Sequence, residues 1–137
     1  MRIIVAPDSY KGSVSAPDVA EAMERGILRI FAEADVCKIP IADGGEGTVA
    51  ALVAATGGEL RQSKVLDPLG RRIDAHWGIL GDGATAVIEM AAASGLPLIP
   101  ASLRDPRRAT SFGAGELIRA ALAARLRRTI PAYGDSK

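Results

Sequence analysis

The first 58 residues alternate twice between a short apolar run and a helical pattern. The apolar runs are "RIIVA" at 2–6 and "DVCKIPIA" at 35–42. Helices are predicted at 15–31, where Ser15 can cap the first turn, and at 48–58. This order favours two parallel strands joined by right-handed crossovers. We therefore predict an α/β fold with a parallel sheet for this part of the chain.

The pattern changes between residues 59 and 93, where short strand-like segments follow one another without room for helices. In 71–80, Ile73 and Trp77 alternate with polar residues, which is typical of a half-buried strand. The sequences "DPLG" and "GDG" supply turns on either side of this strand. We predict a β-meander that forms a smaller subdomain inserted into the α/β layer.

A last helix is predicted at 113–127, after which only "RRTIPAYGDSK" remains. Pro131 and Gly134 oppose a further strand, because proline lacks the N–H that a sheet requires. The α/β layer is therefore expected to be incomplete in this chain. The predicted segments are 1–58 and 106–137 for the α/β domain, the latter with an atypical tail, and 59–105 for the insertion.

Composition excludes several classes of function. The chain has 137 residues with a formal net charge of +1 and 4% aromatic residues, which offers no general attraction to nucleic acid and few stacking platforms. Its apolar runs are too short to cross a membrane. One cysteine and one histidine cannot assemble a zinc cluster, and a single cysteine suits a reducing cytoplasm. A cytoplasmic domain without nucleic-acid or membrane partners is expected.

Two polar loops follow the two predicted parallel strands. The first is "APDSYKGS" at 6–13, and the second is "ADGGEGT" at 42–48. Parallel strands end at one edge of their sheet, and open α/β folds bind ligands at that edge. We therefore predict that both loops contribute to one binding crevice.

The residue types in these loops suit phosphoryl transfer. Glycines at a helix start let backbone N–H groups approach an anion, lysine can neutralise it, and carboxylates can hold magnesium or accept a proton. The candidates in the first loop are Asp8, Ser9, Lys11 and Ser13. The candidates in the second loop are Asp43, Gly44, Gly45, Glu46, Gly47 and Thr48.

Structural explanations stand beside these functional ones. Glycine at a strand-to-helix turn is commonly steric, Glu46 in a first helical turn suits the helix dipole, and Lys11 alone suits a solvated surface. Glu89 lies at the end of an apolar strand, where burial would demand a partner or ligand, and exposure on the polar face is the alternative. The chain contains neither "GxGxxG" nor a P-loop sequence.

Several motifs resemble, in order and spacing, the amino-terminal part of the bacterial glycerate kinase family. They are "IIVAPDSYKGSVSA", "PIADGGEGTVAALVAATGG", "DPLGR", "IEMAAASGL" and "TSFGAGELI". The resemblance implies a flavodoxin-like α/β domain with an inserted smaller domain. It also implies an enzyme that uses ATP and Mg²⁺ to phosphorylate D-glycerate.

The same resemblance assigns roles to individual residues. Lys11, Asp43 and Glu46 are expected to be catalytic, and Asp43 is also expected to contact the metal. The remaining candidates are expected to bind substrate or phosphate; they are Asp8, Ser9, Ser13, Gly44, Gly45, Gly47, Thr48, Glu89 and Ser94.

Members of the family are more than twice as long as this chain, and they continue into a glycine-rich stretch where this chain has "TIPAYGDSK". The chain is therefore expected to be the front part of a larger active unit, with a complementing carboxy-terminal fragment as a partner. Two alternatives remain open. One is a non-catalytic, anion-binding remnant of a kinase, and the other is a receiver-like signalling domain, which the meander at 59–93 disfavours.

Overall fold

A computed structural model describes residues 1–10, 13–39 and 41–134 of the chain. These residues form two compact units, Met1–Asp43 and Gly44–Lys137. The boundaries predicted at residues 58 and 105 both fall inside the second unit, and the three-segment division stays a prediction. The mixture of helices with parallel and antiparallel strands confirms the α/β class.

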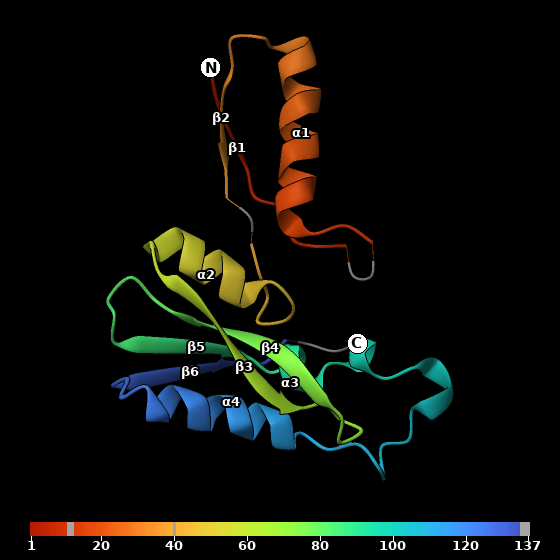
Figure 1. Cartoon of the computed structure of the whole chain (residues 1–137). Coiled ribbons are helices and arrows are strands. Elements are labelled where there is room, and N and C mark those ends of the chain that lie inside the picture. Colours follow the sequence, from red (N-terminus) through yellow and green to blue (C-terminus); the bar gives the residue numbers. More distant parts are fainter. Residues whose placement is uncertain (11–12, 40, 135–137) are drawn as a thin grey trace. The chain divides into compact units, whose positions relative to one another are not determined.

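In its described residues, the first unit contains two parallel strands and one helix. Strand β1 (Arg2–Val5) pairs with β2 (Asp35–Lys38), and Ile3 lies opposite Val36. Helix α1 (Ala16–Ile30) connects them (Figure 1). The helix begins at Ser15, whose side-chain oxygen accepts a hydrogen bond from the Asp18 N–H. The crossover and its cap are thus as the sequence predicts.

Much of the apolar surface of the first unit is exposed. Val5, Ala16 and Ala20 are buried, whereas Ile4 is 62% exposed and Ile30 is 76% exposed. A two-stranded sheet with one helix has too few elements to cover both of its faces. This unit therefore buries little of its apolar surface within the described residues.

The second unit contains a four-stranded sheet in the order β3, β4, β5, β6. Strands β3 (Glu59–Leu66), β4 (Arg72–Ile79) and β5 (Thr85–Glu89) pair antiparallel, which confirms the predicted meander. Strand β6 (Arg128–Ala132) pairs parallel to β5.

The expectation that Pro131 prevents a strand near the end of the chain is wrong. Pro131 lies in β6 opposite Ile88, and β6 is an edge strand. An edge strand needs a hydrogen-bonding partner on one side only, so proline is tolerated there. The sequence after the last helix therefore extends the meander sheet.

Helices cover both faces of this sheet (Figure 1). Helix α2 (Thr48–Thr56) packs on one face, where Val49 and Val53 contact Val87. On the other face lie α3 (Ala91–Ser94) and α4 (Phe112–Ala123), which are connected through short 3-10 turns at Leu96–Leu98 and Ala101–Leu103. The larger core forms here; its buried residues are Val65, Ala75, Trp77, Ala86, Ile88, Ala93, Leu117 and Ala121.

In β4, Gly78 takes the place of a polar side chain in the alternating sequence, because α2 lies close to the strand at this position. Trp77 is buried in the larger core and its indole N–H donates to Ser63, while His76 is exposed. Gly78 lies under α2, where an added Cβ would come within 2.4 Å of a Val53 methyl carbon. The missing side chain therefore allows the helix to lie directly on the strand.

The "DPLGR" turn between β3 and β4 is organised by Asp67, whose side chain is fully buried. Its carboxylate accepts hydrogen bonds from the N–H groups of Leu69 and Arg71 and from the Arg71 side chain. Burial alone would raise the pKa of Asp67, yet these hydrogen bonds and the Arg71 charge lower it below its usual value.

This lowered pKa predicts how stability changes with pH. A carboxyl whose pKa is lower in the folded state stabilises the fold above its unfolded pKa of about 4, and that stabilisation is lost as pH falls. We expect Asp67→Asn to lower the melting temperature at pH 7 and to flatten its decline below about pH 4. Thermal melts at pH 7, 4 and 3 measure both effects, with the exposed Asp74→Asn as the control. An unchanged acid decline in Asp67→Asn would contradict the assignment.

No helix among the described residues is long and apolar enough to cross a membrane.

Candidate functional site

The glycine-rich sequence after β2 forms a tight turn that leads into α2. Gly44 and Gly47 have φ angles of 94° and 93°, a region that residues with a side chain rarely adopt. Gly47 immediately precedes the first residue of α2. Two of the glycines in the candidate anion loop are therefore required by the backbone itself.

The start of α2 is capped by the carboxylate of Glu89. Its Oε2 atom accepts hydrogen bonds from Gly47 N–H at 3.1 Å and from Val49 N–H at 3.2 Å. The Glu89 side chain is buried, and these bonds join the end of β5 to the start of α2. The anion at this helix start is therefore supplied by the chain, and these two N–H groups are already engaged.

The electrostatics of Glu89 reflect this position. Burial raises the pKa of Glu89 above its usual value, while the hydrogen bonds from Val49 and Gly47 act in the opposite direction. The nearby negative charge of Glu46 raises this pKa further. Glu46 is itself exposed. The two carboxylates thus interact across the turn, one buried and one facing solvent.

The segment after β6 packs directly on the glycine turn. A Cβ added to Gly134 would lie 2.2 Å from the Cα of Gly45, and one added to Gly44 would lie 2.8 Å from the Tyr133 carbonyl oxygen. The Met90 N–H donates to the Ala132 carbonyl at 3.1 Å beside this contact. Sequence reasoning missed Tyr133 and Gly134 as part of this site. The sequence feature that pointed to this segment is Gly134 itself, which was interpreted only as a residue that opposes a strand.

Two of the predicted hydroxyl groups, those of Thr48 and Ser94, are enclosed. Thr48 is buried, and the Oγ atoms of Thr48 and Ser94 have no hydrogen-bond partner among the residues that the structure describes. Thr48 follows Gly47 at the start of α2, and Ser94 ends α3. Two polar atoms are thus left unsatisfied in the segments that the sequence singles out for ligand binding.

The first polar loop is described only in part. The Asp8 carboxylate accepts a hydrogen bond from the N–H of Ser9, and backbone hydrogen bonds between Tyr10 and Val14 close the loop. Ser13 is exposed in this turn. Lys11, the expected catalytic cation, lies outside the described residues.

The segments that follow the two strands of the first unit lie side by side, while the predicted binding crevice stays a prediction. Beyond the strands, the N–H of Ile41 donates to the Pro7 carbonyl at 2.9 Å. Asp8 follows Pro7 directly, and Asp43 lies exposed at the end of this unit. Within the first unit, the carboxyl edge of the sheet therefore carries two predicted carboxylates.

The motif "TSFGAGE" has a structural role at the start of α4. Glu116 is buried, accepts the Leu66 N–H at 2.7 Å and pairs with Arg72 at 3.1 Å. The hydrogen bond from Leu66 lowers the pKa of Glu116 below its usual value, against the effect of burial, and Arg72 lowers it further. Glu116 therefore anchors α4 to the end of β3.

The carboxylates described here suit magnesium only if phosphate oxygens and water supply its other ligands. No group of three or more His, Cys, Asp or Glu side chains that could hold a metal occurs among the described residues. Mg²⁺ commonly keeps several waters and binds one or two carboxylates together with phosphate oxygens. The exposed carboxylate of Asp43 is of the kind that suits this mode, with the remaining ligands coming from phosphates and water.

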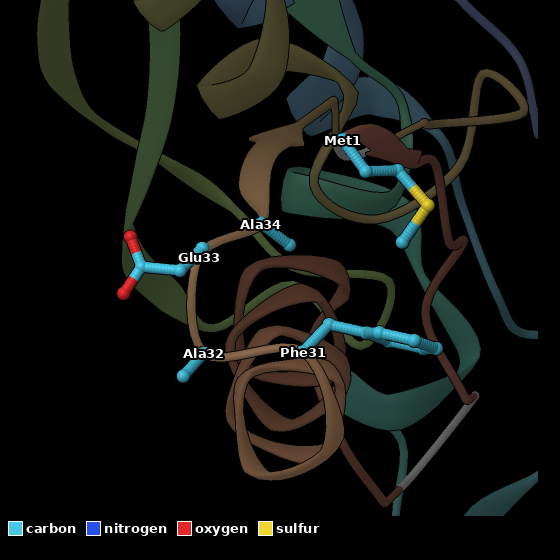
Figure 2. Close-up of a pocket in the computed structure, with 5 residues that line it drawn as sticks. All are labelled: Met1, Phe31, Ala32, Glu33 and Ala34. Atoms are coloured by element: carbon cyan, nitrogen blue, oxygen red, sulfur yellow. The ribbon is translucent and has the colours of Figure 1, made fainter.

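A shallow hollow of about 250 Å³ lies at the end of α1 in the first unit, and Figure 2 shows its lining. The Met1 and Phe31 side chains are apolar, and the Glu33 carboxylate points away from them. The hollow is lined by Met1, Phe31, Ala32, Glu33 and Ala34, and none of the predicted site residues that the structure describes is among them. Its chemistry does not suit an anionic substrate.

Comparison with known proteins agrees with the resemblance seen in the sequence. A sequence profile of the glycerate kinase family matches residues 3–137. Glycerate 2-kinase from Escherichia coli strain K12 is 58% identical over 122 residues, which are 89% of this chain and 32% of that protein. Glycerate kinase from Bacillus subtilis strain 168 is 54% identical over 99% of this chain and 36% of that protein.

A solved structure shows the same likeness. The crystal structure of a protein described as glycerate kinase 2 from Salmonella typhimurium LT2 superposes with a TM-score of 0.76 at 52% identity. It covers 98% of this chain, which in turn spans 36% of that protein. The matched ranges include the tail that the sequence analysis set apart from the family. The chain thus spans about a third of the length of the relatives that it matches.

Proposed function

Because the chain belongs to the glycerate kinase family, we propose that it supplies one part of a kinase that transfers a phosphoryl group from ATP to a hydroxyl of D-glycerate. The observation that carries this proposal is the family match over residues 3–137. Relatives at 58% and 54% identity are named as glycerate kinases. We place this activity in the cytoplasm.

The proposed roles follow the chemistry of the exposed side chains. Glu46 is a carboxylate in the glycine turn, suited to accept the proton of the attacking hydroxyl or to bind the substrate. Asp43 is proposed to hold magnesium, which when bound neutralises charge on the phosphates of ATP. Lys11 is proposed to compensate phosphate charge.

The remaining candidates are proposed as binding groups. Thr48 and Ser94 carry hydroxyls without a partner among the described residues, and each can donate to a substrate or phosphate oxygen. Asp8, Ser9 and Ser13 lie in the partly described first loop. Gly44 and Gly45 are still proposed to bind substrate or phosphate, whereas the Gly47 N–H already donates to Glu89.

A complementing carboxy-terminal fragment is proposed as the partner. The chain spans 32% of the Escherichia coli relative, and the first unit exposes apolar side chains such as Ile4 and Ile30. Burial of an exposed isoleucine contributes about 1.5–3 kcal/mol, which favours coverage by further chain. We expect the carboxy-terminal part of a relative, added as a separate polypeptide, to cover this surface.

The test is an ADP-formation assay that mixes the chain, the carboxy-terminal two-thirds of a relative, ATP, Mg²⁺ and D-glycerate. We expect ADP release that depends on D-glycerate and on both polypeptides. Glu46→Gln is expected to lower the rate by about 10²–10⁴-fold, the usual contribution of a general base. The exposed Glu59→Gln is the matched control. Absence of glycerate-dependent ADP from two folded polypeptides would refute the proposal.

The alternative function is a non-catalytic, anion-binding remnant, which the unused surface of the first unit favours. It predicts that the chain binds phosphate or D-glycerate weakly and never supports ADP formation. Calorimetric titration with phosphate and with D-glycerate, run beside the ADP assay, separates the two functions.

A further inference from the structure

Three segments that are distant in the sequence meet at the glycine turn of the second unit. They are the turn and helix start at 44–49, the end of β5 at 89–90, and the segment at 132–134. The side chain of Glu89 links two of these segments, because one oxygen of its carboxylate accepts hydrogen bonds from the N–H groups of Gly47 and Val49. The turn in turn carries Glu46 directly before Gly47.

We propose that Glu89 is a positioning residue, which acts through the Gly47 and Val49 N–H groups to hold the glycine turn so that Glu46 faces the substrate. This inference rests on the proposed function for the role of Glu46, and on the structure alone for the clasp itself. Three observations support it: the buried carboxylate, its two hydrogen bonds, and the exposed position of Glu46 on the same turn.

The geometry separates this role from that of an ordinary helix cap. An N-cap side chain normally comes from the residue beside the helix start, whereas Gly47 has no side chain and Glu89 is 42 residues away. The turn is therefore fixed relative to the sheet and not only to its own helix. Since Glu46 is held between two glycines, Gly45 and Gly47, its direction depends on this external contact.

Two variants of nearly equal size test the clasp. Glu89→Gln keeps a side-chain oxygen that can accept both hydrogen bonds, whereas Glu89→Leu fills the space without an acceptor. In the ¹⁵N-labelled chain, we expect the amides of Gly47 and Val49 to exchange with solvent about tenfold faster or more in Glu89→Leu. In Glu89→Gln their exchange is expected to stay within about threefold of the wild type.

The matched control is Glu116→Leu, which removes another buried carboxylate that binds a backbone N–H in the same unit. It should speed exchange at Leu66 and leave Gly47 and Val49 unchanged. If Glu89→Leu does not fold, Glu89→Gln still decides, because loss of the charge should shift the amide signals of Gly47 and Val49. Unchanged exchange in folded Glu89→Leu, or unchanged amide shifts in Glu89→Gln, would overturn the proposal.

Affinity for D-glycerate separates positioning from stability. At a temperature where all variants are folded, we expect Glu89→Leu to bind D-glycerate about tenfold or more weakly, with Glu89→Gln restoring most of the affinity and Glu116→Leu leaving it unchanged. Equal losses in Glu89→Leu and Glu116→Leu would reduce Glu89 to a structural role. If the wild-type chain mixed with the complementing polypeptide does not bind D-glycerate, the proposed function loses its substrate, and the amide measurements still decide the clasp.

Discussion

Replacing Gly113 with alanine is expected to separate α4 from the end of β3 and to lower stability by about 3 kcal/mol or more. A Cβ at this position would lie 1.8 Å from the Leu66 carbonyl oxygen. The opposing atom belongs to the backbone, so it cannot move aside as a flexible side chain would. Because Glu116 on the same helix binds the Leu66 N–H, a displaced helix loses that hydrogen bond as well.

Gly115→Ala is the control for this experiment, since it makes the same chemical change two residues along the same helix. No atom lies within 4 Å of a Cβ added there, and Gly115 is exposed. Alanine is therefore expected to stabilise α4 by about 0.5–1 kcal/mol through its higher helix propensity. Urea unfolding measures both free energies. Equal signs for the two substitutions would show that α4 does not approach β3 this closely.

Replacing Leu117 with alanine is expected to cost about 2–5 kcal/mol, the usual loss when a large side chain leaves a packed core. Leu117 is fully buried in the larger core, where the cluster includes Val65, Trp77 and Ile88. Small domains have a total stability of about 5–15 kcal/mol, so this single change removes a large share. The urea midpoint should fall accordingly, while the slope of the unfolding transition stays constant.

Leu122→Ala on the same helix provides the comparison. Leu122 is 61% exposed, so its truncation should change stability by less than about 0.5 kcal/mol. A small loss in Leu117→Ala, comparable to that of Leu122→Ala, would contradict the placement of α4 over the sheet. A near-wild-type far-UV spectrum in both variants would show that the change in free energy does not come from a lost helix.

Local rules predicted most elements of this fold. Ser15 and Gly57 mark helix ends by their own chemistry, and the alternation around Trp77 indicates a strand with one covered face. Strand β6 was missed because Pro131 is unfavourable in most strands, and only the sheet order shows that β6 is an edge. Pairing between distant strands depends on tertiary structure that no short window of sequence contains.

The residues of the candidate site stay a prediction, and the contacts that some of them make could not be read from the sequence. Glu89 attracted attention because a charge in an apolar strand requires a partner, and the partner proved to be the start of α2. The contact between Gly134 and Gly45 had only the glycine in the tail as a signal, because close backbone approach depends on which segments meet in space. Glycines of the "ADGGEGT" turn are therefore explained in part by backbone geometry and close packing, whatever their role in binding.

Pro131 also has a consequence for the behaviour of this chain in concentrated solution. Strand β6 leaves one side of its backbone without a partner strand among the described residues, and such an edge can recruit a second copy and start aggregation. Proline in the middle of that edge removes a donor from any intermolecular ladder. The residue that complicates prediction of the strand is thus also the one that protects it from self-association.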